Sequence, residues 1–342
     1  MADPLAEMFA GLLPERLPEP VAAEAYAPSN IALSKYWGKR DPVLNLPLNS
    51  SLSISLGTWG TTTQIGPSEQ DRFAFNGEAM DLDAPLAARA FRFVDLFRQG
   101  QGPALAIDTK NTIPTAAGLA SSASGFAALT LALDQTFGLG LDRGALSRMA
   151  RVGSGSAARS LWDGFVRWDR GEKADGSDSV ARRLGLDWPE FRIAIVAVDT
   201  GPKEQSSRDG MGHTAATSPL FPPWPDRAEA DCAAVEAAIL AKDFERLGEV
   251  AEANALAMHA TMLAARPRLS YLKPASWAVL ERVWAARNEG RTIFATMDAG
   301  ANVKLIFLED EAEEMAARFP EAQIIAPFDQ APAPETRSRP PA

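Results

Sequence analysis

The chain has 342 residues, 46% of them hydrophobic, which is enough to build one large domain or two smaller ones. Its formal net charge is −10, which does not suit sequence-independent binding to nucleic acid. A single cysteine, Cys232, excludes a disulfide within the chain and, with only two histidines, argues against a structural zinc site. We therefore expect a cytoplasmic protein that binds neither nucleic acid nor membrane.

Predicted strands and helices alternate in the N-terminal half, after an extension at residues 1–22. We expect strands at residues 24–30, 50–56, 61–65, 72–75 and 104–109. Residues 50–56 carry the clearest strand pattern, because small polar and apolar side chains alternate there. We expect helices at residues 84–98, 124–137 and 143–152.

The C-terminal half begins with the apolar run at residues 191–199, which predicts a buried strand. Two helices are expected between residues 227 and 265, a third at 277–289, and strands at 292–297 and 303–308. We place a domain boundary near residue 190, which gives an N-terminal domain at 23–190 and a C-terminal domain at 191–328. The proline-rich tail at 329–342 is expected to be disordered.

An uncharged loop of small residues, NTIPTAAGLASSASG, occupies residues 111–125 and leads into the helix at 124–137. Because none of its side chains is charged, it could hold an anion only with backbone N–H groups, hydroxyls and the helix N-terminus, as phosphate sites do. It lacks the Gly-Lys-Ser/Thr ending of a P-loop and the glycine spacing of the dinucleotide fingerprint. The alternative is a purely structural Gly/Ser loop.

Four further segments carry chemically useful side chains. They are the basic and aromatic residues 30–41 (NIALSKYWGKRD), the residues 153–160 (GSGSAARS), the loop 203–211 (KEQSSRDGM), and Asp298 in the turn MDAGAN. Each has an ordinary alternative: a solvated basic turn, a flexible linker, a surface loop and an Asx turn, respectively. Alone, none of them decides a function.

Together with the serine loop, these segments resemble the diphosphomevalonate decarboxylases of the GHMP kinase superfamily over about residues 25–310. The matching motifs are NIA at 30–32, KYWGKRD at 35–41, LNLPLNSSLS at 44–53, PTAAGLASSA at 114–123, GSGSAARS at 153–160, SSR at 206–208, GM at 210–211, and DAG at 298–300 with Asn302. Two residues depart from the family pattern: Ala158 replaces a cysteine or serine, and Ala301 replaces a proline beside Asp298.

The resemblance implies an α+β, two-domain GHMP kinase-like fold with the active site in a cleft between the domains. It also implies conversion of mevalonate 5-diphosphate and ATP to isopentenyl diphosphate, ADP, phosphate and carbon dioxide, with Mg²⁺ as cofactor and a homodimer as the assembly. The alternatives are a phosphomevalonate decarboxylase, a relative of mevalonate 3-kinase type, and a non-catalytic nucleotide-binding module.

The resemblance also implies roles for individual residues. Asp298 would deprotonate or position the substrate hydroxyl, Lys35 would lie near it, and Arg159 would bind the substrate carboxylate. The nucleotide would contact Gly118, Ala120, Ser121, Ser122, Thr109 and Asn111, with Ser122 also catalytic and the candidate Mg²⁺ ligand. The substrate would contact Tyr36, Lys39, Ser154, Gly155, Ser156, Arg159, Ser207, Arg208 and Met211. We expect His213 and His259 to be core or helix-face residues.

Overall fold

The computed structural model describes residues 3–99, 102–113, 122–199, 201 and 205–329. Within these residues, a seven-stranded sheet forms around the long strand β4 (Ser51–Pro67), which is antiparallel to β1 (Ala23–Ser34). The remaining strands are β7 (Leu105–Asn111), β5 (Arg72–Phe75), β6 (Glu78–Met80), β8 (Phe165–Trp168) and β9 (Ala181–Arg183).

The strands predicted at residues 50–56 and 61–65 are both part of β4. Gly57 lies between them with a φ of 59°, a backbone conformation that glycine adopts without strain, so the chain can bend there and remain in the sheet. The first residues of β4 pair with β8 and its last residues pair with β7.

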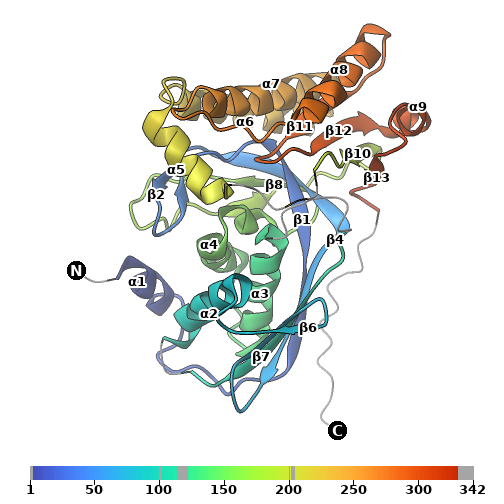
Figure 1. Cartoon of the computed structure of the whole chain (residues 1–342). Coiled ribbons are helices and arrows are strands. Elements are labelled where there is room, and N and C mark those ends of the chain that lie inside the picture. Colours follow the sequence, from blue (N-terminus) through green and yellow to red (C-terminus); the bar gives the residue numbers. More distant parts are fainter. Residues whose placement is uncertain (1–2, 100–101, 114–121, 200, 202–204, 330–342) are drawn as a thin grey trace.

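Three helices cover one face of this sheet: α2 (Pro85–Arg98), α3 (Ser122–Thr136) and α4 (Arg143–Gly153) (Figure 1). The short helix α1 (Pro4–Ala10) of the N-terminal extension packs on α2, and the ring of Phe9 meets Phe93 and Phe97 edge-on. The extension is therefore part of the folded body, because Phe9 is completely buried in the same hydrophobic core as the sheet.

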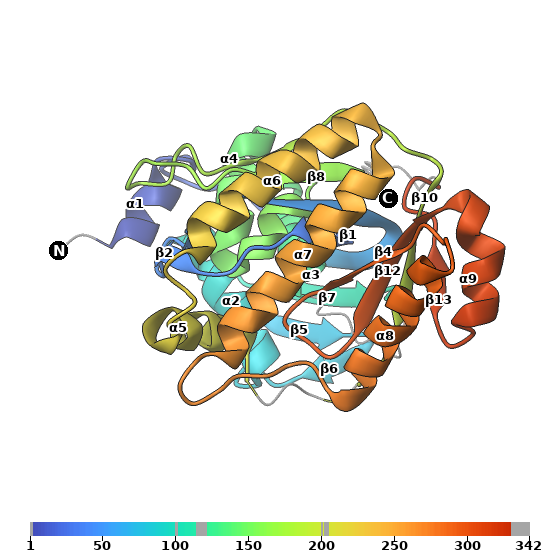
Figure 2. The same cartoon turned by 90° about the horizontal axis from the view of Figure 1, so that it is seen from above.

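The C-terminal part contains a second sheet in the order β11 (Phe294–Met297), β12 (Val303–Leu308), β10 (Phe191–Val196) and β13 (Gln323–Ile325). Its helices are α6 (Trp224–Ala241), α7 (Phe244–Leu263), α8 (Pro274–Asn288) and α9 (Ala312–Arg318). Helices α6 and α7 also lie across the larger sheet, as both views show (Figures 1 and 2).

One hydrophobic cluster joins the two sheets. It combines Ile31 and Leu52 of the large sheet with Ile193 of the small sheet and Leu247 of α7, all fully buried. Burial of apolar surface is the main favourable contribution to folding, so this shared core fixes one sheet relative to the other.

The predicted α+β class is confirmed, but the sequence missed several short elements. They include the hairpin of β2 (Lys39–Asp41) and β3 (Leu46–Pro47), the 3-10 turns η2 (Gly155–Arg159) and η3 (Glu309–Glu311), helices α5 (Ser207–Thr217) and α9, and strands β8, β9 and β13. Helix α5 was predicted as a surface loop because Gly210 and Gly212 lower its helix propensity. The hydroxyl of Ser206 caps it by accepting from the Asp209 N–H at 3.2 Å.

Across the described residues, none of the helices combines the length and the apolar character that a bilayer span requires. The boundary near residue 190 remains a prediction, and the predicted tail beyond residue 329 lies outside the described residues.

Candidate active site

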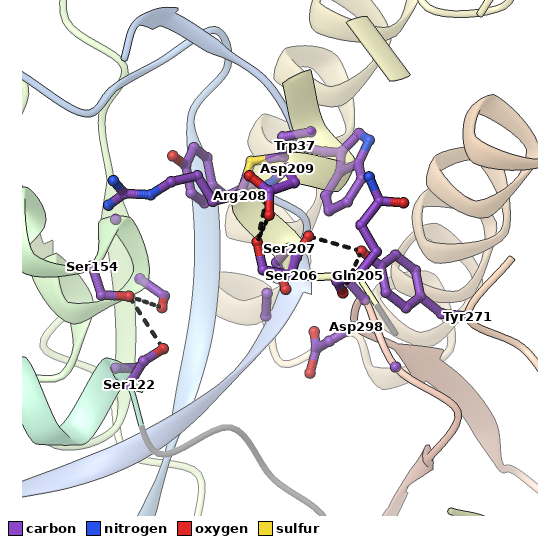
Figure 3. Close-up of a pocket in the computed structure, with 18 of the residues that line it drawn as sticks. Trp37, Ser122, Ser154, Gln205, Ser206, Ser207, Arg208, Asp209, Tyr271 and Asp298 are labelled. Carbon is purple, nitrogen blue, oxygen red and sulfur yellow. Dashed lines mark hydrogen bonds between the residues drawn. The ribbon is translucent and has the colours of Figure 1, made fainter. Parts of the chain in front are cut away.

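A cavity of 1620 Å³ opens between the two parts of the chain. Its walls include Ser122 at the start of α3, Arg208 on α5 and Asp298 directly after β11, which Figure 3 shows facing a common space. The predicted site residues that line it are Lys35, Tyr36, Lys39, Ser122, Ser154, Gly155, Ser156, Arg159, Ser207, Arg208, Met211 and Asp298. The motifs that are far apart in the sequence therefore meet at one site.

The predicted nucleotide contacts are placed differently. Thr109 and Asn111 lie on β7 and are not among the cavity residues; the hydroxyl of Thr61 donates to Oδ1 of Asn111 at 2.8 Å. Gly118, Ala120 and Ser121 lie outside the described residues.

Asp298 is held by two ammonium groups. Nζ of Lys35 lies 2.8 Å from its Oδ1, and Nζ of Lys304 lies 3.1 Å from its Oδ2. Burial alone would raise the pKa of Asp298, but the charges of Lys304 and Lys35 outweigh it and hold that pKa well below its ordinary value. The carboxylate is ionised at neutral pH, and its side chain keeps 37% exposure where it borders the cavity.

Lys35 is fixed by its own backbone as well as by Asp298. Its N–H donates to Oδ1 of Asn254 at 2.8 Å, and its carbonyl accepts from Nδ2 of Asn49 at 2.8 Å. Its Nζ also donates to the carbonyl of Ala32 at 2.6 Å. Burial lowers the pKa of Lys35 to about 8, although Asp298 acts to raise it. The ammonium group is thus aimed at Asp298 with little freedom to move.

Hydrogen bonds to main-chain carbonyl groups hold the turn that carries Asp298. The Gly300 N–H donates to the Asp298 carbonyl at 2.7 Å, and Nε2 of His259 lies 3.2 Å from the same oxygen. Ser276 donates to the carbonyl of Ala301 at 2.6 Å. These contacts hold the turn although Ala301 replaces the family's proline. His259 is buried on α7, as predicted for a core residue, and burial lowers its pKa to about 4.

Arg159, in η2, is a buried cation with unused hydrogen-bonding capacity. Its Nη1 donates to the hydroxyl of Ser51 at 2.6 Å and its Nη2 donates to Oδ1 of Asn30 at 3.4 Å, whereas its Nε has no partner. Within the described part of the chain, no carboxylate lies within ion-pair distance of it. Burial lowers the pKa of Arg159 to about 10, so it stays charged at neutral pH. A planar cation in this state can bind a carboxylate.

A second group of cations, Lys39, Arg89 and Arg208, forms what we call the basic cluster at another part of the cavity wall. Burial, followed by the charges of Arg208 and Arg89, lowers the pKa of Lys39 to about 8. Nη2 of Arg89 donates to the Gly153 carbonyl at 2.7 Å. Like charges held this close repel one another, so a polyanion bound among them would relieve the repulsion.

Three serine hydroxyls line the cavity near the N-terminus of α3. Oγ of Ser154 lies 3.4 Å from Oγ of Ser122, and Figure 3 shows the two side chains facing each other. Oγ of Ser154 also lies 3.4 Å from Oγ of Ser156. Hydroxyls beside a helix N-terminus suit phosphate oxygens, and hydroxyl oxygen is a ligand type that Mg²⁺ accepts. The residues present therefore fit a nucleotide phosphate chain with its metal ion.

Sequence reasoning missed Arg89 and Lys304. Arg89 lies on the helix α2, where a charged residue is ordinary, so nothing local distinguished it. Lys304 did carry a signal, because it is the one charged residue of the strand VKLIFL at 303–308 and is 3% exposed.

Residues 27–181 match the family model described as diphosphomevalonate decarboxylase-like N-terminal domain, and residues 193–333 match the mevalonate 5-diphosphate decarboxylase C-terminal domain. The chain belongs to the diphosphomevalonate decarboxylase family. The resemblance found in the sequence is thereby confirmed, and with it the GHMP kinase-like fold.

Similar proteins of this family cover nearly the whole chain. The diphosphomevalonate decarboxylase of Aspergillus fumigatus is 39% identical over 322 residues, which span 86% of this chain and 78% of the relative. The mevalonate diphosphate decarboxylase structure from Staphylococcus aureus is 36% identical, with a TM-score of 0.85 over 91% of this chain and 97% of that one. The structure of MDDEF in complex with MVAPP, AMPPCP and magnesium is 38% identical, with a TM-score of 0.83 over 90% and 98%.

Proposed function

We propose that this chain catalyses the ATP-dependent decarboxylation of mevalonate 5-diphosphate to isopentenyl diphosphate, with release of ADP, phosphate and carbon dioxide. The observation that carries the proposal is that Asp298, Lys35, Arg159 and Ser122 line one cavity although they come from four separate segments. The complex of a similar protein with MVAPP, AMPPCP and magnesium supports ATP and Mg²⁺ as its co-substrate and cofactor.

The chemistry requires phosphoryl transfer to the oxygen on C3, followed by a fragmentation that involves C3, C2 and C1. The 3-hydroxyl oxygen of the substrate attacks the terminal phosphorus of ATP, ADP leaves with the electron pair of the P–O bond that breaks, and the hydroxyl proton passes to solvent. This step comes first because a free hydroxyl is a poor leaving group. The C3–O bond then breaks with its electron pair on the departing phosphate. The electron pair of the C1–C2 bond forms the C2=C3 double bond as carbon dioxide leaves. Bound Mg²⁺ would neutralise charge on the phosphoryl group during transfer.

Asp298 is assigned to the 3-hydroxyl. As an ionised carboxylate between Lys35 and Lys304 it accepts a hydrogen bond from the hydroxyl and so aims the oxygen at the phosphoryl group. A carboxylate whose pKa is held far below its ordinary value is a weak base, which favours orientation over complete proton abstraction. Lys35 places positive charge beside the oxygen at which negative charge develops.

Arg159 is assigned to the substrate carboxylate. Ser51 and Asn30 each accept from one Nη atom, and because every Nη carries two N–H groups, the guanidinium keeps further N–H donors for the oxygens of a carboxylate. Held in this way, the carboxylate keeps one orientation about the C1–C2 bond until that bond breaks.

The basic cluster and the hydroxyls of Ser154, Ser156 and Ser207 are assigned to the diphosphate, with Tyr36, Gly155, Met211 and Arg208 completing the substrate wall. Three cations around one end of the ligand favour a diphosphate over a monophosphate or an unphosphorylated alcohol. The nucleotide phosphates are assigned to Ser122 and the loop that contains Gly118, Ala120 and Ser121. Thr109 and Asn111, which lead into that loop, are kept as proposed contacts of the adenine.

The test is a paired assay of ADP and carbon dioxide release on mevalonate 5-diphosphate, mevalonate 5-phosphate and mevalonate. We expect kcat/KM to be highest for the diphosphate by about 100-fold or more, the effect of losing about 3 kcal/mol of phosphate contact. Carbon dioxide chiefly from the monophosphate would indicate a phosphomevalonate decarboxylase, and ADP without carbon dioxide a 3-kinase. ATP binding with no turnover of any substrate would indicate a nucleotide-binding module.

We also propose that the protein acts in the cytoplasm as a homodimer, on the basis of the family resemblance and of a single cysteine that is buried and unpaired. Light scattering during gel filtration measures the assembly: a mass of twice 36.6 kDa supports the proposal, and a mass of 36.6 kDa rejects it.

A further inference from the structure

Lys304 is a buried cation beside Asp298 to which the proposed function assigns no role of its own. It stands in β12, where every other side chain is apolar, and its own side chain is 4% exposed. Its Nζ lies 3.1 Å from Oδ2 of Asp298 and donates to the carbonyl of Asn302 at 3.3 Å. The sequence analysis did not select it, and it borders the cavity.

Lys35 and Lys304 each contact a different carboxylate oxygen of Asp298. Lys35 follows β1 of the large sheet and holds Oδ1, whereas Lys304 belongs to the small sheet and holds Oδ2. With both oxygens held, rotation of the carboxylate about its Cβ–Cγ bond is restricted. With one lysine removed, the carboxylate could turn about the remaining contact and lose its aim at the cavity.

A purely structural explanation does not account for the lysine well. A buried ammonium group is costly to desolvate, and an apolar side chain of similar length would fill the same space in this strand at lower cost. The cost is offset here by the ion pair with Asp298, so the position is explained by what the lysine does for that carboxylate.

We propose that Lys304 is a positioning residue of the decarboxylase, which holds Oδ2 of Asp298 so that the ionised carboxylate stays aimed at the substrate's 3-hydroxyl. The inference rests on the proposed function, because it concerns the same site. The charged and titratable groups that face Asp298 are Lys35 after β1, Lys304 on β12, His259 on α7 and Arg159 in η2. Among the neighbouring charges, Lys304 is the strongest influence that lowers the pKa of Asp298.

The kinetic test uses Lys304→Met, which keeps the length of the side chain and removes its charge. The matched control is Lys173→Met, the same change at an exposed loop lysine. For Lys304→Met we expect kcat to fall by about 30-fold or more, with the KM of ATP and of mevalonate 5-diphosphate within about threefold of wild type.

A kcat within about twofold of wild type would overturn the inference. So would a rise in the KM of ATP or of mevalonate 5-diphosphate that parallels the loss of kcat, because a general disturbance of the site weakens binding as well as turnover.

A second measurement needs no turnover. Lys304→Met should lower Tm in the wild-type background but not in the Asp298→Asn background, where the lysine has already lost its anion. An equal fall of Tm in both backgrounds would overturn the inference. Failure of the wild-type protein to release carbon dioxide from mevalonate 5-diphosphate would instead overturn the proposed function, so the two failures can be told apart.

Discussion

Nζ of Lys35 and Oδ1 of Asp298 lie 2.8 Å apart although 263 positions separate them in the sequence. The pair joins the end of a strand in the large sheet to the end of a strand in the small one. Its geometry therefore depends on how the sheets sit together, which the shared hydrophobic core around Ile31, Leu52 and Ile193 determines. The site is built by the fold as a whole and not by any one motif.

Replacement of Asp298 by asparagine should nearly abolish turnover. The variant keeps a hydrogen-bonding side chain of the same size but loses the charge that orients the 3-hydroxyl. We expect kcat to fall by about 10³-fold or more, which corresponds to about 4 kcal/mol of barrier. Steady-state kinetics with mevalonate 5-diphosphate measures the loss, and equilibrium binding of ATP should be unchanged within about threefold.

The control for this change is Asp310→Asn, which alters an exposed carboxylate in η3. It should have wild-type kinetics. Near-normal turnover of Asp298→Asn would remove Asp298 from the reaction and would require another residue to orient the hydroxyl.

Replacement of Arg159 by lysine should impair substrate binding far more than nucleotide binding. Lysine keeps the charge but cannot contact Ser51, Asn30 and a substrate carboxylate at once, because it lacks the planar fork. Loss of one charge-assisted contact should lower kcat/KM for mevalonate 5-diphosphate by about 10- to 100-fold. The KM of ATP should stay unchanged, because Arg159 is not assigned to the nucleotide. A parallel rise in the KM of ATP and the KM of mevalonate 5-diphosphate would contradict the assignment.

The pH dependence of kcat/KM should report two lysines. Burial lowers the pKa of both Lys35 and Lys39 to about 8, so each is protonated below that pH and loses its charge as pH rises through it. The kcat/KM of mevalonate 5-diphosphate should therefore fall above pH 8, with a slope that approaches −2 on a logarithmic plot. Lys39→Arg keeps a cation in the basic cluster at all these pH values, so the slope should decrease toward −1. A flat profile between pH 7 and 10 would contradict these protonation states.

Two glycines near the site should respond oppositely to alanine. A Cβ on Gly153 would lie 2.1 Å from the ring of Phe126, whereas a Cβ on Gly125 would meet nothing within 4 Å. Gly153→Ala should destabilise the protein by about 1–3 kcal/mol through overpacking. Gly125→Ala, in helix α3, should be neutral or stabilising by up to about 1 kcal/mol, since alanine is the better helix former. Chemical denaturation measures the free energy of unfolding of both variants. Equal changes in that free energy would contradict the prediction, because they would mean that the ring of Phe126 moves aside at no cost.

The sequence was informative wherever chemistry requires a short contiguous motif. The serine-rich segment at 153–160, the basic segment around Lys35 and Lys39, and the turn at Asp298 were each visible, because their small and charged residues stand out from their surroundings. The alternation of small polar and apolar residues at 50–56 likewise predicted a strand, but the sequence did not show that residues 50–56 and 61–65 belong to one continuous strand with Gly57 inside it.

What the sequence could not supply was contact between distant elements. Arg89 reaches the cavity only because α2 packs against the start of the 153–160 segment, where it donates to the Gly153 carbonyl. Helix α5 forms despite two glycines because Ser206 caps it and Met211 is buried. Such features depend on tertiary packing, which overrides local propensity.

The most direct test of the account is to measure ADP and carbon dioxide together from purified protein, ATP, Mg²⁺ and mevalonate 5-diphosphate. If phosphorylation of the 3-hydroxyl drives fragmentation, the two products should appear at equal rates, and isopentenyl diphosphate should accumulate with them. ADP formed without carbon dioxide, or neither product formed by folded protein, would contradict the central claim.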